Sequence, residues 1–103
     1  MRIRVSASAA LALALLAAEA RAQTVMDALR RDILADMARD CAVPSGVAAE
    51  PGAFSRSGDR VTVRLGLITC PRWTFGTNPH CGARYCQTDV YDVSGATYEL
   101  IES

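Results

Sequence analysis

Between residues 24 and 39 the sequence has the clearest helical pattern of the chain. Apolar side chains recur there with the i, i+3, i+4, i+7 spacing that places them on one helix face; they are Val25, Met26, Leu29, Ile33 and Met37. Thr24 is an N-cap candidate, because its hydroxyl can accept a bond from a free backbone N–H and Asp27 follows in the first turn, where negative charge suits the helix dipole. We therefore expect an amphipathic helix over residues 24–39, with Cys41 still aimed at the core.

Residues 61–69 alternate strictly between apolar and polar positions, which is typical of a half-buried strand. Shorter strands are expected around 53–56, 87–93 and 96–101, because the turn signals Ser57-Gly58-Asp59 and Ser94-Gly95 separate them from their neighbours. The pattern predicts an α+β fold, in which one N-terminal helix packs on a small antiparallel meander sheet of about four strands, stapled by two disulfides.

The first 22 residues have the features of a secretory signal peptide. Arg2 and Arg4 form a basic start, and the apolar run at residues 7–18 is shorter than the about 20 residues of a spanning helix. Ala20-Arg21-Ala22 has the A-x-A form of a cleavage signal. We expect cleavage after Ala22, a single mature domain at residues 23–103, no stable membrane insertion afterwards, and a periplasmic or secreted product.

Removal of the leader changes the charge of the chain. The leader holds three Arg and one Glu, so the remaining 81 residues carry eight Arg, ten acidic residues and a net charge of −2. A nucleic-acid-binding domain shows a clear basic excess. The composition therefore argues against a nucleic-acid partner.

Four cysteines, Cys41, Cys70, Cys81 and Cys86, fall within this small domain. In an exported chain of this size they predict two disulfides, because the compartment is oxidising and the core is modest. Three pairings are possible. Cys41–Cys86 with Cys70–Cys81 is slightly preferred, since it ties the helix end to a strand start and closes the long loop; Cys70–Cys86 with Cys41–Cys81 is an open alternative.

The cysteines and His80 are also candidates for a metal or catalytic site. The paired C-x2-C spacing of zinc sites is absent from the set Cys70, His80, Cys81 and Cys86. No sequence motif marks a nucleophile or an acid as a catalytic partner of His80. We expect no metal, no cofactor and no catalytic residue, with His80 a loop residue beside a disulfide. Asp89 and Asp92 lie three apart on the predicted strand, so they point to opposite faces and are expected to face solvent.

The segment 71–85 is long for so small a domain and is rich in residues that form binding hot spots. The candidate binding residues are Arg72, Trp73, Phe75, His80, Arg84 and Tyr85. The leading alternative is that the aromatic side chains fold back as core filling, as they commonly do in small domains.

At CPRWTFGTNPHCGARYCQTDVYDV, residues 70–93, the chain resembles a loose group of small exported bacterial proteins of unknown function. That group has an N-terminal helix ending in Cys, a strand ending in Cys, a Cys-Gly-x-x-x-Cys segment and a final strand pair. The resemblance implies the same fold and supplies no activity.

Three functional hypotheses follow. The first is an accessory or binding protein of the bacterial cell envelope that is not an enzyme and contacts a protein partner through residues 71–85. The second is a small periplasmic enzyme or metal-binding protein that uses His80 and the cysteines. The third is a purely structural subunit of an envelope complex.

Overall fold

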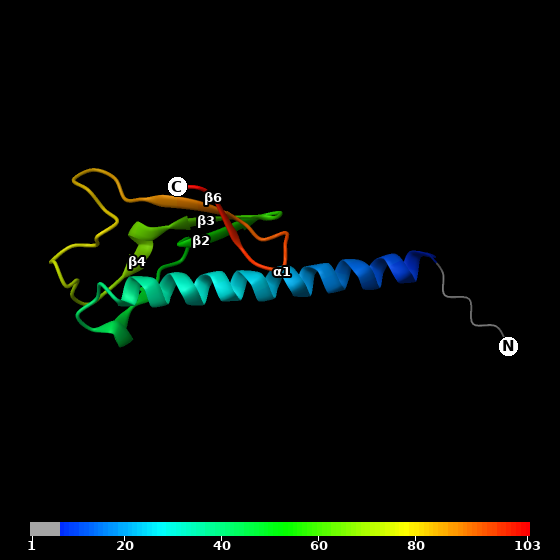
Figure 1. Cartoon of the computed structure of the whole chain (residues 1–103), viewed down its shortest axis with the longest axis horizontal. Coiled ribbons are helices and arrows are strands. Elements are labelled where there is room, and N and C mark those ends of the chain that lie inside the picture. Colours follow the sequence, from blue (N-terminus) through cyan, green and yellow to red (C-terminus); the bar gives the residue numbers. More distant parts are fainter. Residues whose placement is uncertain (1–6) are drawn as a thin grey trace.

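A single long helix, α1 (Ala7–Ala38), runs beneath two antiparallel sheets in the computed structural model, which describes residues 7–103 (Figure 1). The sheets lie over the C-terminal part of α1, and its N-terminal part projects beyond them (Figure 1). Leu13, Leu15 and Leu16 in the projecting part are 60–67% exposed. Arg2 and Arg4, the basic start of the predicted leader, lie outside the described residues. Among residues 7–103 no helix combines the length and apolar character needed to cross a bilayer.

The predicted apolar stripe is the face by which α1 packs on the sheet. Val25, Leu29 and Met37 are at most 4% exposed, and Met26 and Ile33 pack against them. Cys41 is also buried, as the helical spacing predicted. The helix ends at Ala38, just before the predicted end.

The predicted helix start at Thr24 is wrong for the full chain. Residues 7–23 continue the helix, and the Thr24 hydroxyl donates to the carbonyl of Ala20, 3.0 Å away. The helix before Thr24 also meets the domain, since Ala22 is 8% exposed and Glu19 pairs with Arg56 at 3.6 Å. Thr24 can act as an N-cap only in a chain that starts close to it.

The larger sheet has the strand order β2-β3-β5-β6, a meander in which sequence neighbours pair antiparallel. Its strands are β2 (Phe54–Ser57), β3 (Arg60–Arg64), β5 (Thr88–Asp92) and β6 (Glu99–Glu102). Val61 lies opposite Tyr91, and both are buried against α1 in the core. The α+β architecture with a helix on a four-stranded meander is therefore confirmed.

The continuous strand predicted for residues 61–69 is interrupted. β3 ends at Arg64, a 3₁₀ turn η2 (Leu65–Leu67) follows, and β4 (Ile68–Thr69) pairs with β1 (Ala48–Ala49) in a separate two-stranded sheet; a second 3₁₀ turn, η1 (Pro44–Gly46), precedes β1. The turn shifts the apolar phase, because Leu65 and Ile68, three residues apart, are both buried. Glycine at position 66 allows the turn to pack closely against Cys86, because a Cβ there would lie 2.6 Å from the Cys86 sulfur.

All four cysteines form disulfides, as expected, but the preferred pairing and the open alternative, Cys70–Cys86 with Cys41–Cys81, are both wrong. Cys41 bonds to Cys70 with their Cα atoms 5.9 Å apart, and Cys81 bonds to Cys86. The preferred pairing assumed that a Cys70–Cys81 bond closes the long loop, which would leave Cys41 to bond with Cys86 at the start of the next strand. Instead α1 ends beside the end of β4, and the close neighbours Cys81 and Cys86 face each other as an isolated antiparallel bridge.

The two disulfides are expected to differ in their effect on stability. Loop entropy predicts a loss of about 3.5 kcal/mol when Cys41 and Cys70, 29 residues apart, are both replaced by Ala, and about 2 kcal/mol for Cys81 and Cys86, five apart. Loss of the buried Cys41 side chain adds to the first value. Urea midpoints of the two double variants measure this. An equal loss, or a larger one for Cys81 and Cys86, would contradict the pairing.

Candidate functional site

The contact loop, defined as residues 71–85, leaves the end of β4 and returns at β5 without a helix or a strand of its own. Its first end is fixed to the end of α1. The Cys41–Cys70 bond lies there, Ala42 donates its backbone N–H to Arg72 at 2.8 Å, and Thr74 donates to Asp40 at 2.9 Å. The chain therefore enters the contact loop from a fixed position.

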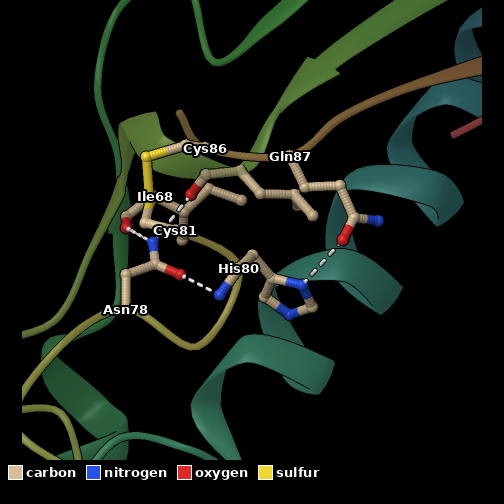
Figure 2. Close-up of a disulfide and its surroundings, with 7 residues drawn as sticks. Ile68, Asn78, His80, Cys81, Cys86 and Gln87 are labelled. Atoms are coloured by element: carbon tan, nitrogen blue, oxygen red, sulfur yellow. Dashed lines mark hydrogen bonds between the residues drawn. A yellow bond between two sulfur atoms is a disulfide. The ribbon is translucent and has the colours of Figure 1, made fainter. Parts of the chain in front are cut away.

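The second end of the contact loop is closed by the clip, defined as residues 81–86 (Figure 2). Inside the disulfide, the N–H of Gly82 donates to the carbonyl of Tyr85 at 2.7 Å. Just outside it, the N–H of Gln87 donates to the carbonyl of His80, also at 2.7 Å. These bonds make a small antiparallel hairpin whose tip carries Arg84.

Asn78 fastens the middle of the contact loop to the η2 turn (Figure 2). Its amide nitrogen donates to the carbonyls of Leu65 and Ile68 at 3.0 and 3.5 Å, and its amide oxygen accepts the N–H of His80 at 2.9 Å. Sequence reasoning missed this residue. The signal was present in the Asn78-Pro79 dipeptide, which is a turn marker.

A short hydrogen-bonded chain orients His80. The amide nitrogen of Gln87 donates to the Asp89 carboxylate at 2.8 Å, so the Gln87 oxygen faces His80 Nδ1, 3.4 Å away (Figure 2). Because that oxygen can only accept, the contact requires the tautomer with the hydrogen on Nδ1, in which Nε2 is the acceptor nitrogen. The chain depends on Asp89, which is 6% exposed, so the expectation that Asp89 faces solvent is wrong.

Burial of Asp89 also affects the neighbouring core. Desolvation raises the pKa of Tyr91, and the negative charge and hydrogen bonding of Asp89 raise it further. Tyr91 therefore stays in the neutral form as part of the core.

The aromatic side chains of the contact loop separate into two kinds. Trp73 is half-buried and packs against the core, next to its backbone bridge with Cys41. Phe75 and Tyr85 are 83% and 82% exposed. Core filling therefore applies to Trp73, whereas Phe75 and Tyr85 are displayed.

The six candidate binding residues do not form one cluster joined by side-chain bonds. Arg72 and Arg84 are exposed at opposite ends of the contact loop, and His80 is half-buried beside the clip. Within residues 7–103, no aromatic pair or side-chain hydrogen bond joins Trp73, Phe75 and Tyr85. Two displayed aromatics at separate anchored points are better suited to an extended partner surface than to a small ligand.

In the part of the chain that the structure describes, no group of three His, Cys, Asp or Glu side chains lies close enough to hold a metal ion. The four cysteine sulfurs are already bonded in pairs, so they offer no thiolate ligand while oxidised.

A cleft of about 490 Å³ that sequence reasoning did not predict lies between α1 and residues 96–98. Its walls include Val25, Ala28 and Ala96, and Arg31 lies at its edge. One bond closes it: the Tyr98 hydroxyl donates to the Asp32 carboxylate at 2.6 Å. The centroid of the Tyr98 ring lies 5.7 Å from that of the Tyr91 ring, and the two rings meet edge to face. The hydrogen bond from Tyr98 to Asp32 therefore joins the last hairpin to the helix.

Comparisons of the chain with protein families, with curated proteins and with solved structures find no match. The functional argument therefore depends on the geometry of the described residues. The two disulfides, which are typical of oxidising compartments, indicate a non-cytoplasmic protein.

The bond between Tyr98 and Asp32 predicts a pH dependence of stability. Donation from Tyr98 lowers the pKa of Asp32 below its usual 3.8, and the same bond raises the pKa of Tyr98 above 10.0. The Asp32 contribution is complete above pH 3.8 and is lost as the pH falls through the lowered pKa. The Tyr98 contribution is complete below pH 10.0 and is lost as the pH rises through the raised pKa.

Urea midpoints of the wild type and of Tyr98→Phe, measured from pH 2 to 11, test this coupling. The difference between the two proteins should be greatest at neutral pH and shrink at both extremes. Asp32→Asn is the matched variant for the acid side. Curves that stay parallel over the whole range would contradict the pH coupling of this bond.

Proposed function

We propose that this protein is a small exported accessory or binding protein of the bacterial cell envelope, which contacts a partner protein through the contact loop. In this proposal residues 1–22 are removed on export and the domain acts in the periplasm or outside the cell. The observation that carries the proposal is the exposure of Phe75 and Tyr85, at 83% and 82%, on a loop anchored at both ends.

Two physical arguments support this use of the loop. Exposed aromatic side chains leave apolar surface in water, and aromatic and arginine residues dominate the binding energy of protein interfaces. The loop is also already ordered by two disulfides and by the Asn78 bonds, so less conformational entropy is lost when a partner binds. Arg72 and Arg84 add charge-assisted contacts at the two ends.

A second candidate function rests on His80. The Gln87 oxygen, whose amide is bonded to Asp89, faces Nδ1 and not Nε2, and a general base or a single metal ligand requires one ring nitrogen that is held in this way. No nucleophile is placed beside it among the described hydrogen bonds. We therefore assign His80 to the contact surface as a polar group.

Separate Phe75→Ala and Tyr85→Ala variants distinguish these functions. Because both side chains are exposed, stability should stay within about 0.5 kcal/mol of the wild type. Binding to an envelope partner should weaken by about 2 kcal/mol, or about 30-fold in Kd. Urea midpoints and affinity capture from envelope extracts, followed by titration of the captured protein, provide the two measurements.

Two control variants accompany this test. Leu100→Ala removes an exposed apolar side chain outside the loop and should leave binding unchanged. Trp73→Ala should cost about 2 kcal/mol of stability, less than the full range for a fully buried Trp, because Trp73 is half-buried. If every variant retains every partner, the loop is not the contact surface and the purely structural role gains support. Loss of an activity in His80→Ala alone would favour the second candidate.

A further inference from the structure

The two disulfides lie in contrasting surroundings. Cys41 is 4% exposed and Cys70 is half-buried, so their bond is covered at the junction of α1 and β4. In the clip, Cys81 is half-buried, whereas Cys86 is exposed. Thiol–disulfide exchange requires access of a thiolate to one sulfur, so the two bonds differ in susceptibility to attack.

A hollow of about 300 Å³ lies beside the clip, and Cys86 rather than Cys81 lines it. The wall next to the sulfur is Gly66. A Cβ at that position would lie 2.6 Å from the Cys86 sulfur and 3.5 Å from the Cys81 sulfur, so glycine allows the chain to pack this closely against the clip. The hollow therefore lies on the side of the clip that carries Cys86.

The hollow has a positive rim. Its lining residues include one charged side chain, Arg64, whose Nη1 is held by the carbonyl of Gly52 at 3.2 Å and the hydroxyl of Ser55 at 3.1 Å. An approaching thiolate is therefore attracted to this side of the disulfide.

From the exposure of Cys86, the hollow that it lines and the Arg64 charge in the lining of that hollow, we propose that the clip is a thiol–disulfide exchange site for an external dithiol. One thiolate of the dithiol attacks the Cys86 sulfur. A mixed disulfide forms, the Cys81–Cys86 bond breaks, and its electron pair leaves on the Cys81 sulfur. The second thiol of the reactant then closes on the first, which releases Cys86.

The reaction is balanced. The external dithiol is oxidised to a disulfide, the clip gains two electrons, and the two protons of the dithiol end on Cys81 and Cys86. After the disulfide is reduced, the hairpin is held by its two backbone hydrogen bonds, from Gly82 to Tyr85 and from Gln87 to His80. The covered Cys41–Cys70 bond remains, so the core persists while Arg84 and Tyr85 gain freedom. This chemistry does not depend on the proposed contact with a partner protein.

The oxidised exported protein, treated with dithiothreitol under native conditions, tests the proposal. Samples are quenched with iodoacetamide at intervals and mapped by mass spectrometry. Cys81 and Cys86 should become labelled on the order of ten-fold faster than Cys41 and Cys70, while the far-UV circular dichroism stays native. Labelling of all four cysteines at one rate, or labelling that begins only with unfolding, would overturn the proposal.

The role of the hollow is tested by the charge at position 64. Arg64→Gln should slow the reduction of the clip by about three-fold to five-fold at low ionic strength, whereas Arg64→Lys should retain most of the rate. Equal rates of clip reduction in the two variants would show that the charge of Arg64 does not act on the reaction. If either variant fails to fold, the wild type decides: reduction that slows as salt is added supports the positive rim, and a rate independent of salt contradicts it.

The choice of sulfur is tested separately. Cys81→Ser leaves Cys86 as a free thiol, and Cys86→Ser leaves Cys81. The first variant should react with an aromatic disulfide reagent on the order of ten-fold faster than the second. The opposite order would assign the attack to Cys81.

Discussion

The Cys41–Cys70 bond joins the end of α1 to a point 29 residues further along the chain, where β4 ends and the contact loop begins. The backbone bonds from Ala42 to Arg72 and from Thr74 to Asp40 repeat that junction on both sides of the disulfide. Their joint effect is to hold the apolar stripe of Leu29 and Met37 against the sheet, since the helix end cannot move away from the strands. A domain of this size has a small core, which makes such a junction important for its stability.

The position of the contact loop follows from the same junction. One end is fixed at Cys70 and the other by the clip at β5, while Asn78 holds the middle to the η2 turn. With its backbone fixed at three points, the loop places Trp73 on the core and holds Phe75 and Tyr85 in solvent. Two bonds of different accessibility thus serve different purposes, one in the core and one at the surface.

Periodicity was sufficient to predict the helix stripe, the core strands and the α+β class, because burial of one face imposes a pattern on the sequence. It was not sufficient at Leu65, where a single 3₁₀ turn reverses the phase and redirects β4 to a second sheet. The disulfide pairing and the buried Asp89 were also mispredicted, since both depend on which segments meet in space. The candidate binding residues were identified by type, but their division into half-buried Trp73 and exposed Phe75 and Tyr85 required the fold.

The central claim is that the helix end is bonded to the strand end that begins the contact loop. Peptide mapping of the oxidised protein without reduction tests it directly. The predicted result is one linked peptide pair containing Cys41 and Cys70 and a second linkage between Cys81 and Cys86. Recovery of Cys41 bonded to Cys86 or to Cys81 would contradict the account, because the contact loop would then be anchored differently.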